Sequence, residues 1–442
     1  MSDTRSHPAA LRSLALLSAA ALLAPAAPAL AEAEWITQNL ASADRVGLVL
    51  SSGALRLDQD TAEEGTAARS GDGGAVGGLA VFPEQRLDAA ADRLEVSVRA
   101  EGDLRDLLVE ARGLRGDGMW TEWHPASRGD RVALPEPVSW VQLRVEVEKE
   151  DAALAGLRVR PVEDAGERRG TGGYGYGYDG YGTEGEGEPG RETDAPFSAR
   201  LFATRIGLVG ATTANGHTVR ADDHFAALPS RRALASRETG EYTVRVCTTG
   251  ALGPHPPVGE VEGHERRCAY LPVWDVGPWN TTDDHWNASR SAWPDLAHGR
   301  PQAQAAYHDG HNGGLDGFGR RVRNPAGIDL ADGAFREGLE LPTNGWVDVD
   351  YLWTAEYGSR ARITTASRKD PVIVRGGPGR EHGAVGLAAH SAVVDVRCRI
   401  DGDEVRGPFG TGGVWYRIGE GDYVPAVFAD GGADARECSP EP

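Results

Sequence analysis

The sequence predicts an all-β protein of several domains. Its 442 residues are about three times the length of a typical single domain. Glycine (59) and proline (26) make up about a fifth of the chain, above the usual ~12 %, which favours short strands joined by many turns. Runs in which apolar and polar residues alternate recur along the chain, whereas long amphipathic helices do not.

The charge balance excludes a general binder of nucleic acid. The chain carries 46 basic and 66 acidic residues and a net charge of -20. No basic stripe is present to release counterions from a polyanion.

Residues 1–31 are expected to be a secretory signal peptide. Arg5 and Arg12 supply the positive region, residues 14–23 are apolar, and residues 29–31 (Ala-Leu-Ala) offer a cleavage site between small residues. No later segment approaches the ~18 apolar residues that a transmembrane helix needs. We therefore expect a secreted protein that is extracellular or associated with the cell wall, with no membrane contact after cleavage.

The four cysteines are expected to form two disulfides. Cys247 ends one alternating run and Cys268 begins another, so two neighbouring antiparallel strands would hold these sulfur atoms together. Cys398 and Cys438 then pair with each other. A nucleophilic cysteine beside a histidine is the alternative, but an oxidising compartment and an even count favour disulfides.

Residues 35–163 are predicted to form a β-sandwich. Residues 93–99 and 138–147 alternate with period two, and turn residues separate such runs at the spacing of a sandwich. Trp120 and Trp123 could form a sugar-binding platform or pack as core or edge aromatics, and packing is favoured. Beyond this module, residues 164–196 are rich in Gly, Tyr and Glu and lack apolar periodicity, which indicates a flexible acidic linker.

Residues 198–354 contain the candidate chemistry. Polar clusters surround His224, Asp275 and Asp329, and the region lacks long amphipathic helices apart from a short candidate near residues 301–307. Asp275 is expected at the rim of a strand that runs into a Gly-Pro turn. Asp329 is expected between apolar neighbours at the start of a short helix.

Four motifs of this region occur in a family order. They are "TANG" at residues 213–216, "LP" at 228–229, "DVGPW" at 275–279 and "IDLA" at 328–331. Together they resemble the double-psi β-barrel of the rare lipoprotein A, expansin and family-45 endoglucanase group. The resemblance spans most of residues 200–354 and implies action on a polysaccharide.

Asp329 occupies, by this resemblance, the position of the barrel's catalytic carboxylate. Glycosidic cleavage needs a general acid that is protonated near neutrality. A carboxyl between Ile328 and Leu330 at a groove floor could meet this need, because desolvation disfavours its charged form.

A second carboxylate would be needed for hydrolysis with inversion. Asp275 is the first candidate, Asp222 or Asp223 are the others, and His224 is expected in support. A lytic transglycosylase needs only one carboxyl, and expansin-like members loosen polymers without net hydrolysis. The sequence leaves these three mechanisms open.

Aromatic side chains are the candidates for substrate stacking. Six of the 11 tryptophans lie between Trp274 and Trp353. Trp274, Trp279 and Trp286 could line a groove and stack on sugar faces, or pack inside the domain.

No metal or cofactor is expected. Eight histidines fall between residues 217 and 311, but no HExxH, HxH or Cys/His spacing of a zinc site occurs. No phosphate-binding loop, nucleophile elbow or dinucleotide fingerprint is present either.

Residues 360–438 resemble the bacterial SH3-type domain that targets proteins to the cell wall. The matching segments are "VRGGPG" at 374–379, "VDVRC" at 394–398 and "WYRIGEGDYV" at 415–424. The resemblance implies a small barrel that binds peptidoglycan in a shallow aromatic groove, with Trp415 and Tyr423 as the candidate residues.

The sequence thus favours a monomeric wall-associated protein that binds and cleaves peptidoglycan or another cell-wall polysaccharide. The alternative is a non-catalytic or expansin-like wall binder, and a metal-dependent peptidase is a third, weaker possibility.

Overall fold

The computed structural model confirms an all-β fold, with about 47 % of residues in strands and 10 % in helices. The predicted signal peptide and residues 164–194 of the predicted linker lie outside the described residues. The chain from Glu34 onward forms one compact unit. The structure describes residues 33–58, 77–126, 131–162, 195–255, 259–355 and 358–439.

The N-terminal region forms a ten-stranded sheet in the order β2-β5-β9-β6-β10-β4-β3, with β1, β7 and β8 attached to it. Its strands are β1 (Ile36–Thr37), β2 (Asp44–Val46), β3 (Leu48–Ser51), β4 (Ala54–Leu57), β5 (Gly78–Val81), β6 (Gln85–Glu101), β7 (Leu107–Gly113), β8 (His124–Pro125), β9 (Arg131–Val147) and β10 (Ala153–Pro161).

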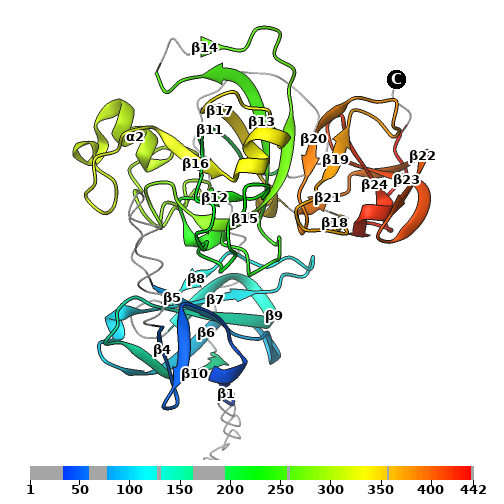
Figure 1. Ribbon diagram of the computed structural model, residues 1–442. Helices are drawn as coiled ribbons and strands as arrows, with labels where there is room; N and C mark the ends of the chain where they lie inside the picture. Colours follow the sequence, from blue (N-terminus) through cyan, green and yellow to red (C-terminus); the bar gives the residue numbers. More distant parts are fainter. Residues whose placement is uncertain are drawn as a thin grey trace, which may run out of the picture. The chain divides into compact units, whose positions relative to one another are not determined.

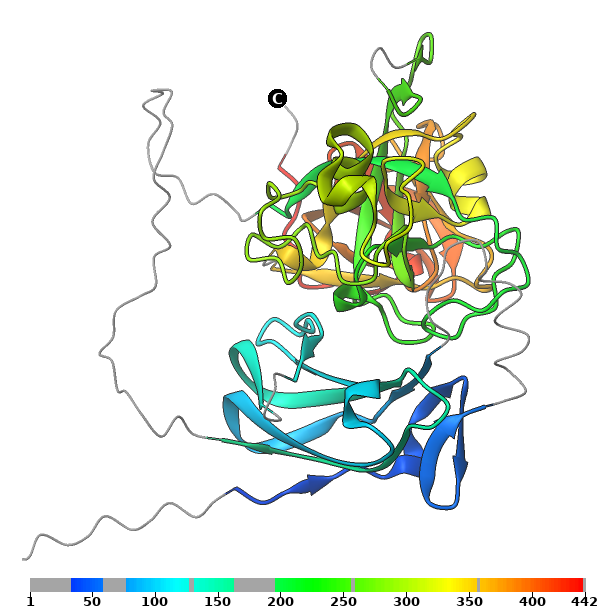
Figure 2. The same ribbon diagram turned by 90° about the vertical axis from the view of Figure 1, so that its left-hand side faces the viewer.

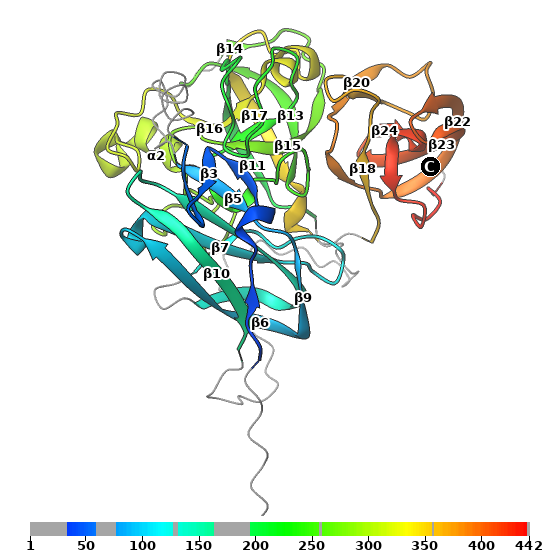
Figure 3. The ribbon, with the colours of Figure 1, turned by 60° about the horizontal axis from the view of Figure 1, so that its bottom comes forward.

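The long strands β6 and β9 join two layers of this sheet. They pair with each other over residues 85–95 and 131–141, after which β9 continues beside β5 and β7 and β6 continues beside β10 (Figure 3). The blue, cyan and teal strands therefore form two facing layers (Figure 2). Their inward apolar side chains share one core, which includes Leu94, Leu143 and Val159.

The second half of β9 is buried on both faces. Val141, Leu143 and Val145 point into the sandwich core, as the alternation predicts. The polar residues between them, Gln142 and Arg144, are buried as well. Another part of the chain therefore covers the polar face of this strand.

Six strands of the middle region close into a barrel (Figure 1). The ring runs β13-β17-β11-β16-β12-β15 and back to β13, with parallel pairing in β11–β16 and β12–β15 and antiparallel pairing in the other four. The strands are β11 (Ser198–Arg205), β12 (Ala226–Leu228), β13 (Thr243–Leu252), β15 (Cys268–Val276), β16 (Ala326–Leu330) and β17 (Gly345–Tyr351), and β14 (Gly259–Glu260) pairs with β13.

The segment between β15 and β16 holds the expected helix. α2 (Gln302–Asp309) starts after Pro301 and ends at Gly310, whose φ of 71° suits a glycine. Short helical turns elsewhere are η1 (Leu40–Ser42), η2 (Leu104–Asp106), η3 (Arg231–Ala233), η4 (His311–Gly314), η5 (Ala334–Gly338), η6 (Leu352–Thr354) and η7 (Ala426–Phe428).

Both predicted disulfides are confirmed. Cys247 on β13 and Cys268 on β15 lie directly opposite each other and are bonded. Cys398 and Cys438 form the second bridge. The two bridges indicate that the protein folds in an oxidising environment.

The C-terminal strands continue the sheet of the barrel. β20 pairs in parallel with β15, and the order then runs β20-β19-β24-β23-β22, while β21, β18 and β25 form a separate small sheet. The strands are β18 (Arg360–Ile363), β19 (Val372–Arg375), β20 (Ala384–Ala388), β21 (Val393–Asp395), β22 (Cys398–Gly407), β23 (Gly410–Gly419), β24 (Asp422–Pro425) and β25 (Ala429–Gly431).

Buried polar contacts reinforce this junction. The Tyr270 hydroxyl donates to Asp422 Oδ2 at 2.7 Å, and Arg245 lies 2.9 Å from Asp350 and 3.6 Å from Asp422. One apolar core also spans the barrel and the C-terminal strands, from Leu271 to Val424. The barrel and the C-terminal unit therefore stabilise each other.

Replacing Gly386 by Ala should break the β15–β20 pairing. A Cβ at Gly386 would lie 1.7 Å from the Cys268 carbonyl oxygen, so the two strands must separate. We expect the free energy of unfolding to fall by about 3 kcal/mol, measured by denaturant titration. Gly383→Ala is the control, because a Cβ added at Gly383 would have no atom within 4 Å; equal stability of the two variants would contradict the role of this pairing.

Candidate functional site

Asp275 and Asp329 flank one residue of the barrel. Ala227 on β12 pairs with Asp275 of β15 on one side and with Asp329 of β16 on the other. Residues in register on neighbouring strands project from the same face of a sheet. The two carboxylates therefore point to the same side, with their Cα atoms two strand spacings, roughly 10 Å, apart.

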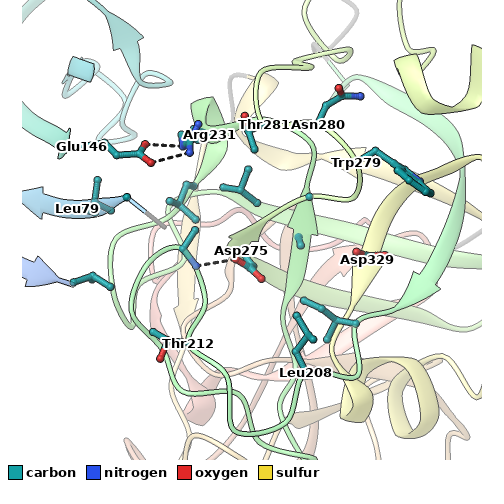
Figure 4. Close-up of a pocket in the computed structure, with 18 of the residues that line it drawn as sticks. Leu79, Glu146, Leu208, Thr212, Arg231, Asp275, Trp279, Asn280, Thr281 and Asp329 are labelled. Carbon is teal, nitrogen blue, oxygen red and sulfur yellow. Dashed lines mark hydrogen bonds and ion pairs between the residues drawn. The ribbon is translucent and has the colours of Figure 1, made fainter. Parts of the chain in front are cut away.

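That side is the face opposite the barrel core. Leu228, Ile328 and Leu330, which neighbour Ala227 and Asp329 in sequence, pack into the apolar core, and so does Trp274 before Asp275. Asp275 and Asp329 instead line a cavity of about 130 Å³ (Figure 4). The strand alternation thus determines that both carboxylates face the cavity.

Each aspartate is held by a hydrogen bond. The backbone N–H of Ala214, in the "TANG" turn, donates to Asp275 Oδ1 at 2.7 Å. The Thr204 hydroxyl, on β11, donates to Asp329 Oδ1. Asp329 is only 7 % exposed and lies within strand β16, so the expectation that it begins a short helix was wrong.

The N-terminal sheet completes the cavity wall. Leu79 and Glu146 line it together with barrel residues, and both oxygens of Glu146 lie 2.8 Å from the guanidinium of Arg231 (Figure 4). Burial raises the pKa of Glu146, although Arg231 opposes this shift. The site therefore contains a third carboxylate, which the sequence analysis missed. Glu146 belongs to the polar side of the alternating run at residues 138–147, and a buried polar side of that strand is the feature that could have indicated it.

Two arginines of the N-terminal sheet hold it against the barrel. The guanidinium groups of Arg112 and Arg144 each lie 4.3 Å from the ring of Trp123. Arg112 also donates to Glu241 at 2.7 Å, and Arg144 donates to the Arg231 carbonyl at 2.8 Å. The polar face of β7 and β9 is therefore buried because this cluster packs against the barrel region.

Trp123 itself is an anchor and not an exposed platform. It is buried, and its indole N–H donates to the Leu234 carbonyl at 3.1 Å. Trp120, half-buried, has the Arg112 guanidinium 4.6 Å from its ring centre. The packing role that the sequence favoured for this pair agrees with these contacts.

Glu122, between these two tryptophans, accepts hydrogen bonds from several barrel donors. The indole N–H groups of Trp286 and Trp353 donate to Oε1 at 2.6 and 2.9 Å. Asn287 donates to Oε2 at 2.8 Å, and Arg232 lies 2.9 Å from the same oxygen. One carboxylate thus ties the N-terminal loop to two parts of the barrel region.

His224 does not line the cavity with the two aspartates. It is buried, its Nε2 lies 3.6 Å from Glu337, and burial lowers its pKa. Asp223 accepts hydrogen bonds from His217 Nε2 and from the Arg220 amide, both at 2.6 Å, and neither Asp222 nor Asp223 lines the cavity. Of the candidate second carboxylates, only Asp275 shares the cavity of Asp329.

The candidate tryptophans of the barrel region have different environments. Trp279 is half-buried, lines the cavity and donates to Asn324 at 3.0 Å. Trp274 and Trp286 are buried, with their indole N–H groups bonded to Thr239 and Glu122. Only Trp279 offers an aromatic surface beside the aspartates.

The candidate aromatics of the C-terminal unit are also buried. Trp415 is 1 % exposed and donates to the Asp403 carbonyl at 2.9 Å, and Tyr423 is 6 % exposed. The exposed large apolar side chains of this unit are Ile373, Phe409 and Val414. A binding surface on this unit would therefore use other residues than the sequence proposed.

Neither a metal cluster nor a membrane-spanning helix is found in the part of the chain that the structure describes. No group of three or more His, Cys, Asp or Glu side chains there could hold a metal ion. No helix there is long and apolar enough to cross a membrane.

Replacing Glu122 by Gln should destabilise the protein strongly. The Gln amide would offer one oxygen to donors that now contact both carboxylate oxygens of Glu122. Its NH₂ group would face the N–H groups of the remaining donors. We expect a loss of about 3–5 kcal/mol in the free energy of unfolding, measured by denaturant titration. The exposed Glu150→Gln variant is the control, and equal stability of both variants would argue against Glu122 as an anchor.

Comparison with known proteins identifies only the barrel region. Residues 197–350 match the model of a family described as a domain of unknown function (DUF8814). No curated protein and no solved structure matches the chain. The match extends from β11 to all but the last residue of β17, so it spans the strands of the closed barrel in this chain.

Proposed function

We propose that this protein is secreted and acts on a bacterial cell-wall glycan, which its barrel binds and cleaves. The observation that carries this proposal is the placement of Asp275 and Asp329 on either side of Ala227, facing one cavity. Paired carboxylates that face each other across a site are the machinery of glycosidic cleavage. The two disulfides support folding outside the cytoplasm.

The hydrogen bonds favour different roles for the two aspartates. A backbone N–H can only donate, so the Ala214 amide favours the ionised form of Asp275. The Thr204 hydroxyl donates to Asp329 in the structure, but a hydroxyl can also accept, so this contact permits a protonated Asp329 at its buried position as well. We therefore assign Asp329 as the general acid and Asp275 as the base that activates water.

The strand spacing favours inversion among the glycosidase mechanisms. With Cα atoms roughly 10 Å apart and side chains that project to the same side, the two aspartates leave room for the ~6.5–9.5 Å between carboxyl groups that inverting enzymes use. A lytic transglycosylase would use Asp329 alone.

The double-psi assignment has support in the connectivity. The closed ring of six strands with parallel β11–β16 and β12–β15 pairs agrees with such a barrel, and residues of three of the four motifs (Ala214, Asp275 and Asp329) line the cavity. For the C-terminal unit, we propose an SH3-like wall-binding role that uses the exposed Ile373, Phe409 and Val414.

A non-catalytic wall binder is the second candidate, and the size of the cavity favours it. About 130 Å³ is well below the ~300 Å³ of a small-molecule site. A sugar would reach Asp329 only after the cavity wall around Leu79 and Trp279 has moved. In this case the aspartates bind or orient a polymer without cleaving it.

Soluble fragments released from purified peptidoglycan would distinguish the two candidates. We expect release by the wild type and a fall of about a hundredfold or more for Asp329→Asn and Asp275→Asn. The Asp348→Asn variant, which changes an exposed aspartate of the same barrel, is expected to retain wild-type release.

The chemistry of the released ends identifies the mechanism. New reducing ends indicate hydrolysis, and internally cyclised sugars indicate transglycosylation. Retention of the wild type on insoluble wall, with no fragments released, would overturn the enzymatic proposal and support the binder.

A further inference from the structure

We propose that the C-terminal unit binds a phosphate-bearing ligand in a cavity lined by Arg397, Arg417 and Arg436. This cavity has a volume of about 740 Å³, within the ~300–1,000 Å³ of small-molecule sites. Residues of the C-terminal unit line most of it, together with Ala195 and Pro196 before β11, and the proposal does not depend on glycan cleavage by the barrel.

Backbone geometry brings the three arginines together. The Arg397 amide donates to the Arg417 carbonyl at 2.9 Å, which joins the start of β22 to β23. Arg436 Nε donates to the Arg397 carbonyl at 3.3 Å, and the Arg399 amide donates to the Arg436 carbonyl at 2.8 Å. The three positions therefore converge from separate parts of the sequence.

The second disulfide fixes this arrangement. Cys398 follows Arg397 and lies opposite Arg417 in the β22–β23 register. Its partner Cys438 is two residues beyond Arg436. The bridge thus ties the last described segment to the start of β22, next to Arg397 and opposite Arg417.

The cavity is locally basic in an otherwise acidic protein. Its lining includes three guanidinium groups and two carboxylates, those of Asp395 and Asp434, whereas the whole chain has a net charge of -20. Among the described residues, Arg417 and Arg436 have no carboxylate within ion-pair distance, and Arg397 lies 3.6 Å from Asp395. The cavity therefore holds cationic groups that an anionic ligand can pair with.

The number of guanidinium groups favours phosphate over carboxylate. Each guanidinium offers planar pairs of N–H donors that fit two oxygens at once. A carboxylate has two oxygens, so one or two such pairs satisfy it, whereas a terminal phosphate offers three oxygens and more charge. Three arginines around one cavity match the larger anion.

Isothermal titration of the full chain with inorganic pyrophosphate tests this site. We expect saturable binding, weakened about 10- to 100-fold in Arg417→Gln and Arg436→Gln. Arg362→Gln, which changes an arginine of the same unit that is paired with Asp430, is expected to bind as the wild type does. Melting curves of each variant establish that it is folded.

Two further measurements test the preference for phosphate and the role of the disulfide. Acetate at the same ionic strength should bind more weakly than pyrophosphate, and equal binding would overturn the preference for phosphate. The double variant Cys398→Ser/Cys438→Ser should lose affinity while all three arginines remain. No saturable binding by the folded wild type, or equal affinity of the arginine variants, would overturn the site.

Discussion

The burial of a polar sheet face is the constraint on which the rest of the structure depends. Arg112 and Arg144 enclose the ring of Trp123, and each guanidinium also has a buried carboxylate partner. Burying a charge is costly unless it is paired, so the ion pair of Arg112 with Glu241 of the barrel region favours one docked arrangement of β7 and β9 on the barrel. That arrangement in turn brings Glu146 to the cavity of the two aspartates.

The barrel and the C-terminal unit share a continuous sheet and one apolar core. In the parallel pairing of β15 with β20, Gly386 allows the close approach that a side chain would prevent. The cluster of Tyr270, Arg245 and Asp422 places hydrogen-bonded polar groups inside the same junction. The C-terminal strands and the barrel strands are therefore stabilised by the same sheet and the same core.

Ordinary strand geometry places the two aspartates of the candidate site, and residues of the N-terminal sheet cover them. Ala227 separates two aspartates that would be solvated on an uncovered barrel, and residues of the N-terminal sheet enclose them with a third carboxylate. Three acidic groups and the Arg231 guanidinium line this one small cavity. Its small volume makes movement of the surrounding wall the step on which any action on a polymer depends.

The sequence by itself determined the all-β class, the two disulfide pairs and the short helix after Pro301. Local alternation and turn residues carry this information, because each depends on neighbours in the chain. Only the tertiary structure decided that Asp275 and Asp329 share a cavity, that Trp274, Trp286 and Trp415 are buried and that Glu146 joins the site. Periodicity distinguishes the apolar face of a strand from its polar face, but a polar face looks the same in sequence whether water or another sheet covers it.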